Sequence, residues 1–498
     1  MSPSARFVFA PVELDTAHPR LTCAGEPLAI SDRQLDVLLL LVTRAGQIVS
    51  KDDLLQAGWK DVAVGDNSLE QAISTLRRLL GARAPDVAFI ETVPRRGYRF
   101  VAGVERTVAR ESDAGLEALL APHRAFVEGR LAIESFEADQ IPRARRVFEG
   151  ALVAAPDHAS AHIGLANACV MQYEMTRADP APDRASLEVA AHHAREACRL
   201  DPGSSEAWAT LGFVLDRTGD RLDALAAAKR AVALEGDNWR HHFRLAYVGW
   251  GEERLRSAHR TLAALPAFPL AHWLAATVYV ARQVPGEAER ELVAGLAALA
   301  RSAEGDSRFS GLALHWLLGL TYLARGDDRR ALEEFRRELA VEPAGHLYAR
   351  ECAGNTWYAI GALHLRHGRR AEAADAFEEA LRRVPLHPMA GLGKRAANTT
   401  APPRPDVGTG VDVDVPVAGL PRVPGVPGGP GVDAALVRAG HLVLAGAHVE
   451  AARVVDAALA EAPASPSGWL LPLEPLLHVS ARPEIWANAL ARLRNRAA

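Results

Sequence analysis

Hydrogen-bonding side chains that could read a nucleic acid recur on one face of a helix predicted over residues 67–80. They are Asn67, Gln71, Ser74 and Arg78, with Thr75 beside them. Asn, Gln and Arg can each pair two atoms with a base edge, and Ser and Thr can reach bases or phosphates. A helix that lies in a DNA groove needs this mixture. For the helix taken alone, the alternative is an amphipathic helix whose polar face meets only water.

The opposite face of the same helix is apolar. Leu69, Ile73, Leu76 and Leu80 recur at intervals of four, three and four residues, which places them on one side of a helix. We therefore expect this side to pack on a protein core while the polar side points outward.

Two adjacent arginines lie at the tip of a predicted β-ribbon that follows the helix. Residues 88–92 alternate as a strand, Gly97 supplies the turn, and residues 98–101 return as a second strand. Holding Arg95 beside Arg96 is costly unless an anion lies opposite, and a phosphate row or a minor groove would supply one. The ribbon therefore favours nucleic acid as the partner of the polar helix face.

The helix and the ribbon together resemble a known domain family. Residues 90–100 (IETVPRRGYRF), placed after residues 67–69 (NSL) and 76–81 (LRRLLG), are similar to the winged-helix DNA-binding domain of OmpR/PhoB-type regulators, in its CadC-like and HilA-like variant. The resemblance covers residues 6–105, which makes it more specific than a short motif. The candidate DNA-binding residues are Asn67, Ser68, Gln71, Ser74, Thr75, Arg77, Arg78, Thr92, Arg95 and Arg96.

The resemblance implies a small sheet and two further helices before the reading helix. Short alternating segments at residues 7–9, 12–14, 20–23 and 28–30 are expected to form the sheet. Helices are predicted over residues 32–44, after Ser31, and over residues 51–57, where Ser50 and Asp53 have the spacing of a capping box.

Two departures from the response-regulator pattern bear on function. Ser74 and Thr75 stand where that pattern often has arginines, so the base preference is expected to differ. Only a few residues precede the first strand, so we expect no phosphoacceptor domain upstream. In the family, the loop equivalent to residues 59–65 can touch RNA polymerase, which makes RNA polymerase a candidate partner. A packed connector anchored by Trp59 is the alternative for this loop.

Charge is unevenly distributed in this N-terminal region. Residues 1–66 carry 6 Lys and Arg against 9 Asp and Glu, whereas residues 67–106 carry 7 against 4. The positive excess therefore lies on the proposed reading helix and ribbon, as DNA binding requires. Over residues 1–106 the two signs balance at 13 each, which leaves open a winged helix that binds protein in a non-DNA-binding scaffold.

From about residue 116 the sequence is helical and repetitive. Gly319, Ala331, Phe335 and Pro343 have the same spacing as Gly361, Ala373, Phe377 and Pro385. Small residues let paired helices approach, the aromatic ring fills the gap to the next unit, and proline ends the second helix. This spacing resembles tetratricopeptide repeats. Units are expected at residues 124–156, 158–202, 204–237, 238–268, 269–302, 308–343, 350–386 and 433–463, with a terminal helix at 485–494.

A segment rich in proline and glycine interrupts the repeats. Residues 401–431 hold 8 prolines and 7 glycines, so we expect a disordered linker there. The predicted organisation is an α+β winged helix-turn-helix domain followed by an all-α tetratricopeptide solenoid. The expected bounds are 1–106 for the winged helix, 107–115 for a hinge, 116–395 for the solenoid, 396–432 for the linker and 433–498 for C-terminal repeat-like helices.

Signals for an enzyme, a metal site, a disulfide framework or a membrane span are weak. The four cysteines are far apart, and His158/His162 and His364/His367 have metal-ligand spacing that chance explains in a chain with 18 histidines. The sequence around residues 391–394 (GLGK) lacks the rest of a P-loop. The longest apolar run, residues 309–323, is too short for a membrane helix, and no N-terminal signal is evident.

The sequence therefore predicts a cytoplasmic, bacterial-type transcriptional regulator that needs no cofactor and is not an enzyme. Its expected partners are double-stranded DNA, bound as a possible dimer, and a protein or peptide on the solenoid. An antibiotic-regulatory-protein-like activator, which joins such a winged helix to a shorter helical domain, is the alternative within this class.

Overall fold

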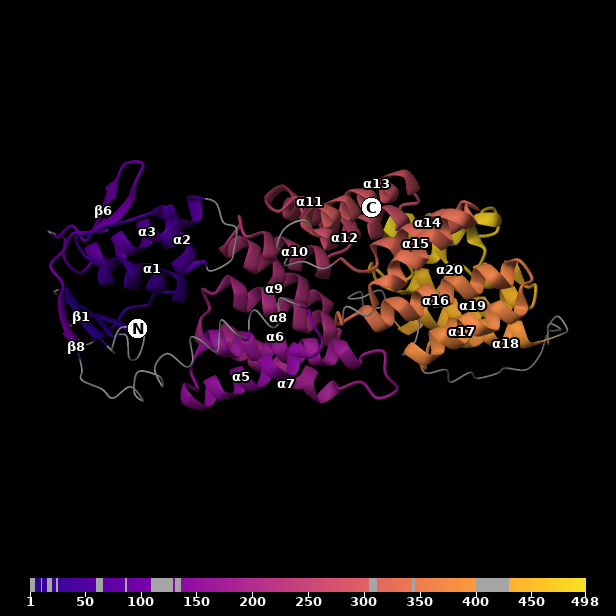
Figure 1. Cartoon of the computed structure of the whole chain (residues 1–498), viewed down its shortest axis with the longest axis horizontal. Coiled ribbons are helices and arrows are strands. Elements are labelled where there is room, and N and C mark those ends of the chain that lie inside the picture. Colours follow the sequence, from indigo (N-terminus) through magenta and orange to yellow (C-terminus); the bar gives the residue numbers. More distant parts are fainter. Residues whose placement is uncertain are drawn as a thin grey trace.

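The computed structural model describes residues 5–9, 11–15, 20–23, 26–59, 66–85, 87–108, 129, 136–303, 311–342, 345–399 and 430–498. Figure 1 shows a small domain of strands and helices at the N-terminal end and a long stack of helices beyond it. The fold class predicted from the sequence, a winged helix followed by a tetratricopeptide-type solenoid, is confirmed.

Five antiparallel strands open the chain, in the order β4-β3-β2-β1-β8. Their bounds are β1 Ala5–Phe9, β2 Val12–Asp15, β3 Arg20–Cys23, β4 Glu26–Pro27 and β8 Glu105–Val108. The strand expected at residues 28–30 is wrong, because a tight hairpin pairs Glu26 with Cys23 and leaves Leu28 to enter the core. Since β8 pairs with β1, the segment expected to be a hinge from residue 107 begins as a strand.

Three helices complete the core of the winged helix: α1 Asp32–Thr43, α2 Lys51–Gly58 and α3 Asp66–Gly81. Both predicted starts are capped, since Ser31 and Gln34 form a capping box and the Ser50 hydroxyl accepts the Asp53 backbone N–H at 3.1 Å. The apolar side chains of α3 are buried among aromatic rings such as Phe100. The buried side of α3 thereby fixes which of its side chains face outward.

The wing is a second sheet with the order β5-β7-β6. Its strands are β5 Ile48–Val49, β6 Ile90–Val93 and β7 Gly97–Phe100. Gly97 has a φ of +132°, and a Cβ at this position would overlap the carbonyl oxygen of Val49. Only glycine therefore lets β7 approach β5 this closely.

Antiparallel helix pairs form the solenoid, and each unit expected between residues 158 and 342 contains one pair within the described residues. The helices are α5 Gln140–Ala154, α6 Ala159–Thr176, α7 Arg184–Leu200, α8 Ser205–Thr218, α9 Arg221–Leu234, α10 Trp239–Val248, α11 Glu252–Ala264, α12 Pro269–Ala281, α13 Pro285–Ala303, α14 Leu314–Ala324, α15 Asp328–Ala340, α16 Ala349–Arg366 and α17 Arg370–Arg383. Pro343, which the repeat pattern includes, lies outside the described residues.

The repeating glycine and phenylalanine meet across two of the pairs, α14–α15 and α16–α17. A Cβ on Gly319 would lie 2.5 Å from the Phe335 ring, and a Cβ on Gly361 would lie 2.6 Å from the Phe377 ring. The recurring interval in the sequence is therefore a contact between a glycine on the first helix and a buried ring on the second.

Replacing Gly361 by Ala is expected to lower the free energy of unfolding by about 1–3 kcal/mol, because the Phe377 ring is fully buried and is also packed against Gly393. Gly391 is the matched control, since a Cβ there meets only Arg395, at 3.7 Å. Gly391→Ala should raise stability by about 0.5–1 kcal/mol, because alanine favours a helix. Urea unfolding of the two variants checks the opposite signs, and equal effects would contradict the packing argument.

The solenoid also closes on itself. The segment before α16 meets the segment before α5, where Leu347 donates its backbone N–H to Phe136 O at 2.7 Å and Ala138 donates to Gly345 O at 3.1 Å. At the same junction Arg177, at the end of α6, donates to Glu351 Oε2 in α16 at 2.8 and 2.9 Å. Residues 174 positions apart in the chain are thus joined by a buried ion pair.

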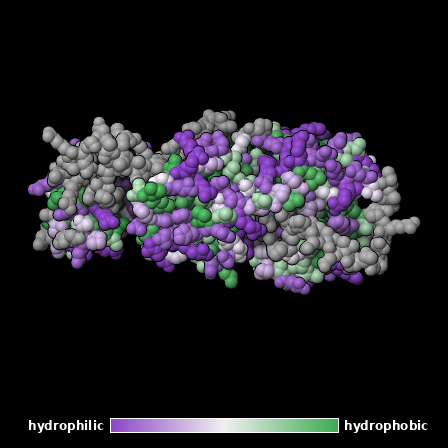
Figure 2. All heavy atoms as spheres, turned by 90° about the horizontal axis from the view of Figure 1, so that it is seen from below, coloured by the Kyte–Doolittle hydropathy of each residue, from purple (hydrophilic) through white to green (hydrophobic). Residues whose placement is uncertain are grey.

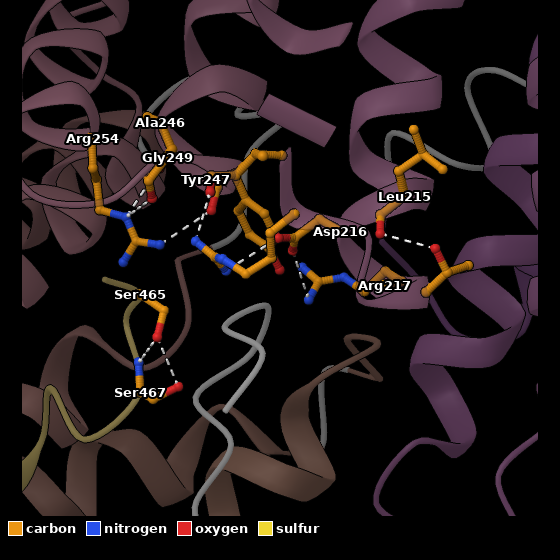
Figure 3. Close-up of polar contacts among 12 residues, drawn as sticks. Leu215, Asp216, Arg217, Ala246, Tyr247, Gly249, Arg254, Ser465 and Ser467 are labelled. Atoms are coloured by element: carbon orange, nitrogen blue, oxygen red, sulfur yellow. Dashed lines mark hydrogen bonds and ion pairs between the residues drawn. The ribbon is translucent and has the colours of Figure 1, made fainter. Parts of the chain in front are cut away.

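A network of buried charges extends from this junction into the stack. Arg177 also contacts Glu174 at 3.2 Å, Glu174 lies 3.2 Å from Arg217, and Arg217 lies 3.4 Å from Asp216. Figure 3 shows Asp216 and Arg217 near Arg254, which donates to the carbonyls of Ala246, Tyr247 and Gly249. The positive and negative charges in this network offset one another.

The C-terminal helices continue the stack and then fold back. They are α18 Pro388–Asn398, α19 Pro430–Leu444, α20 His448–Glu461, η3 Leu471–Leu473, η4 Val479–Ala481 and α21 Ala487–Arg496. In the segment at residues 391–394 (GLGK), Gly393 packs against Phe377, and Lys394 forms an ion pair with Glu378 at 3.0 Å. Both residues therefore have structural contacts. Arg282 donates to Ala497 O at 2.7 Å, which ties the C-terminal end to the middle of the solenoid.

One face of the molecule is mostly hydrophilic over the solenoid, with hydrophobic residues in small separate patches (Figure 2). Among the helices that the structure describes, none combines the length and apolar character that crossing a membrane requires.

Candidate nucleic-acid interface

The outer face of α3 carries the side chains that are predicted to read DNA. Asn67, Gln71, Ser74 and Arg78 are exposed, and Ser68 and Thr75 are half-buried. The four aliphatic side chains on the other side of α3 are almost completely buried. Because both faces fall where the periodicity placed them, α3 can present its polar face to a groove.

The side chains of Arg77 and Thr92 form a hydrogen bond with each other. Arg77 Nη2 donates to Thr92 Oγ1 at 2.7 Å, and Arg77 Nε donates to Ile90 O at 3.0 Å. The guanidinium also lies 5.9 Å from the centre of the Tyr98 ring. These contacts brace the wing against α3. A direct contact of Arg77 and Thr92 with DNA remains a prediction from the sequence.

Arg95 and Arg96 occupy the turn between β6 and β7. Both are exposed, and Arg95 adopts a φ of +61°. No carboxylate of the described residues lies within ion-pair distance of either guanidinium, whereas Arg99, on β7, pairs with Glu91 at 2.6 Å. The wing tip therefore holds two adjacent cations that are available to an anion.

A cleft of about 320 Å³ divides the candidate residues into two groups. Ser68, Gln71 and Thr75 line this cleft, whose opposite wall belongs to the solenoid. Asn67, Ser74 and Arg78 do not line it. One flank of the reading helix thus faces the solenoid, and the other faces away.

Side chains from both domains meet at this cleft. Apart from Trp59, which was expected to anchor a packed connector, none of them was singled out from the sequence. Arg33, in α1, forms an ion pair with Glu235, which follows α9. Trp59 Nε1 donates to the same carboxylate at 3.3 Å, and Asp32 accepts a hydrogen bond from the Ser160 hydroxyl. Arg33 and Glu235 lie 202 positions apart, so no local pattern could have revealed the pair.

Glu235 is held as a carboxylate by several donors. Ser205 Oγ donates to it at 2.7 Å, Asn238 Nδ2 at 3.2 Å, and His241 Nε2 lies 3.1 Å away. Burial alone would raise the pKa of Glu235, but the bond to His241 and the charge of Arg33 outweigh burial and hold the pKa well below its usual range. Glu235 therefore stays anionic and retains Arg33.

A second cavity, of about 130 Å³, lies between the first helices of successive pairs, α6, α8 and α10. We call it the groove; its walls are mainly apolar. Arg244 faces the groove and donates to Asn167 Oδ1 at 3.1 Å, and burial lowers its pKa to about 10. No carboxylate of the described residues lies within ion-pair distance of Arg244. Arg33 also lines the groove, so the winged helix stands at its edge.

The histidine pairs with metal-ligand spacing bind protein groups. His158 accepts the Ala161 N–H, His162 contacts His193 at 2.8 Å, His364 accepts from Arg369 at 2.8 Å, and His367 pairs with Asp328. Among the residues with described positions, no group of three or more His, Cys, Asp or Glu is arranged to hold a metal ion. In the loop expected to touch RNA polymerase, residues 60–65 lie outside the described residues.

Family models match both parts of the chain. Residues 25–100 match the model described as "Transcriptional regulatory protein, C terminal", and residues 130–205 and 354–387 match tetratricopeptide-repeat models. The chain therefore joins an OmpR/PhoB-type winged-helix domain to tetratricopeptide repeats.

Individual relatives share only part of the chain. A cholera toxin homolog transcriptional activator of Vibrio parahaemolyticus is 32% identical over 111 residues, which are 22% of this chain and 37% of that protein. The transcriptional regulator HilA of Salmonella typhimurium is 41% identical over 71 residues, 14% of this chain and 13% of HilA. The solved DNA-binding domain of Escherichia coli CadC is 26% identical and covers 21% of this chain and 98% of that structure, with a TM-score of 0.19. The chain thus spans little more than a third of the length of the first of these relatives, and less of HilA.

Proposed function

We propose that this chain is a DNA-binding transcriptional regulator whose winged helix binds promoter DNA and whose solenoid binds a protein or peptide partner. The observation that carries the proposal is the wing tip, where Arg95 and Arg96 are exposed side by side with no acidic neighbour among the described residues. Two such cations suit phosphates or a minor groove. The hydrogen-bonding face of α3 and the family of residues 25–100 support the same function.

The groove supports the second half of the proposal. Its apolar walls and the half-buried side chain of Arg244 suit a segment that brings apolar side chains and an acidic group. A cytoplasmic location, dimers on DNA and a contact with RNA polymerase through residues 59–65 complete the proposed mode of action. Control in this proposal reaches the winged helix from the solenoid.

The experiment that tests DNA binding is a salt titration of the full chain on a short duplex. We expect binding at low salt with an affinity that falls steeply as salt rises, because phosphate contacts release counterions. Absence of binding, or binding that salt does not weaken, would instead favour a scaffold whose winged helix binds protein.

Residues on α3 and on the wing should differ in what they control. Replacing Gln71 or Ser74 by Ala is expected to change which sequence is preferred, with about 1–3 kcal/mol lost for each base contact. In vitro selection from random duplexes, with wild type and each variant in parallel, measures the change. Unchanged preference in both variants would contradict the role assigned to α3. Glu70→Ala, a change at an exposed neighbour on the same helix, is the control.

A further inference from the structure

We propose that the contact between the winged helix and the solenoid is a latch that keeps one flank of the reading helix away from DNA. The latch consists of three contacts. Arg33 forms an ion pair with Glu235, Trp59 donates a hydrogen bond to Glu235, and Asp32 accepts a hydrogen bond from Ser160. This inference rests on the proposed DNA binding, since a latch needs a site to close.

The latch determines what can reach α3. Ser68, Gln71 and Thr75 face the solenoid across a cleft of about 320 Å³. That space admits water, but a major groove is about 12 Å wide and 8.5 Å deep, and its two backbones need room on either side of the helix. A duplex therefore cannot engage this flank until the two domains separate, although Asn67, Ser74 and Arg78 stay accessible.

The chemistry of the latch allows it to open. Each apolar core of the described residues belongs to one domain, and none includes residues from both. The contacts described above between the two domains are polar, and polar interfaces between domains permit relative motion. In the closed state the carboxylates of Asp32 and Asp201 repel each other. The pKa of Asp201 is raised mainly by burial and to a smaller extent by this repulsion. Attraction at Glu235 and repulsion at Asp201 thus oppose each other.

The latch also connects the reading helix to the groove. The Arg33 side chain that pairs with Glu235 forms part of the groove wall, beside α6 and α10. A segment that fills the groove would compete with Arg33 for this space. Binding of a partner to the solenoid would therefore favour the open state of the winged helix, since a ligand shifts an equilibrium toward the state it binds better.

A reversible crosslink tests the latch in the full chain. Asp32→Cys and Ser160→Cys place two thiols where the hydroxyl and the carboxylate now touch, in a Cys23→Ser background. The three remaining cysteines, Cys169, Cys198 and Cys352, are buried, and burial raises the pKa of each thiol, so they stay unreactive. The oxidised protein is expected to bind a short mixed-sequence duplex at least about tenfold more weakly than the same protein after reduction. Equal affinity of the oxidised, fully crosslinked protein and the reduced protein would overturn the latch and leave DNA binding intact.

A single substitution tests the opposite direction. Glu235→Ala removes the acceptor of Arg33 and Trp59 and is expected to increase the affinity of the full chain for the same duplex about tenfold. The control, Glu253→Ala, makes the same charge change and breaks the ion pair between Glu253 and Lys229, whose charged atoms lie 2.8 Å apart. Neither of these two residues lines the cleft. An affinity no higher for Glu235→Ala than for the control would overturn the latch. Failure of every one of these proteins to bind DNA would overturn the proposed function and the latch together.

Discussion

A full-length protein with Arg95→Asn and Arg96→Ala is expected to bind every duplex about 30-fold more weakly at physiological salt. The two guanidiniums are exposed at the wing tip and lack an acidic partner among the described residues, so DNA phosphates would be their main anions. The slope of log affinity against log salt should fall in magnitude by about 2, close to one for each lost phosphate contact. Asparagine is chosen at position 95 because Arg95 has a φ of +61°, which asparagine tolerates better than alanine.

The control for this variant keeps the net charge of the wing. Glu91→Gln with Arg99→Gln removes the ion pair of 2.6 Å from the same ribbon without changing the total charge. Its affinity and salt slope should stay close to those of wild type. An Arg95/Arg96 variant that changes sequence preference while keeping its affinity would reverse the roles assigned to the wing and the reading helix.

Arg177→Ala is expected to lower the free energy of unfolding by about 3–5 kcal/mol, because it leaves two carboxylates buried without their shared cation. The Arg177 side chain is 4% exposed, and those of Glu174 and Glu351 are 0% and 9% exposed. Burial acts to lower the pKa of Arg177, but the two carboxylates outweigh burial and raise it well above its usual value. The arginine is thus charged at any pH at which the fold persists.

A surface ion pair supplies the comparison. Arg329 pairs with Glu333 at 2.8 Å, but its side chain is 75% exposed, so Arg329→Ala should change stability by less than about 1 kcal/mol. Chemical denaturation of both variants measures the difference. Similar losses for the two would show that the buried network at the junction contributes no more than exposed charges do.

The features that sequence alone revealed are those with a local period. The apolar stripe of α3 and the glycine-to-phenylalanine interval in the solenoid each reflect one helix meeting its neighbour, so spacing was enough to predict the contact. The spacing of Ser50 and Asp53 also predicted the start of α2, because the Ser50 hydroxyl caps the backbone N–H of the residue three positions later. By contrast, the strand expected at residues 28–30 was misplaced, because β4 and its hairpin are too short to produce an alternating pattern in the sequence.

Contacts between distant parts of the chain produce no such local pattern in the sequence. Arg33 could in principle pair with any of 61 Asp and Glu residues, and nothing near it in the sequence singles out Glu235. The same holds for Arg177 and Glu351 at the junction of the solenoid. The polar outer face of α3 could thus be predicted from the sequence, while the division of that face by the cleft required the folded chain.

The closing contact between the segments before α5 and α16 changes how the solenoid should assemble. In an open stack each repeat touches only its neighbours, so folding can begin anywhere and ends can fray independently. Here Phe136 and Leu347 must meet across 211 positions, and the entropy of closing so long a loop is lost before the contact forms. We therefore expect assembly to finish with a slow ring-closing step, because contacts between residues far apart in the chain form slowly. Once it is closed, the helix pairs from α5 to α15 are expected to unfold together as one cooperative unit.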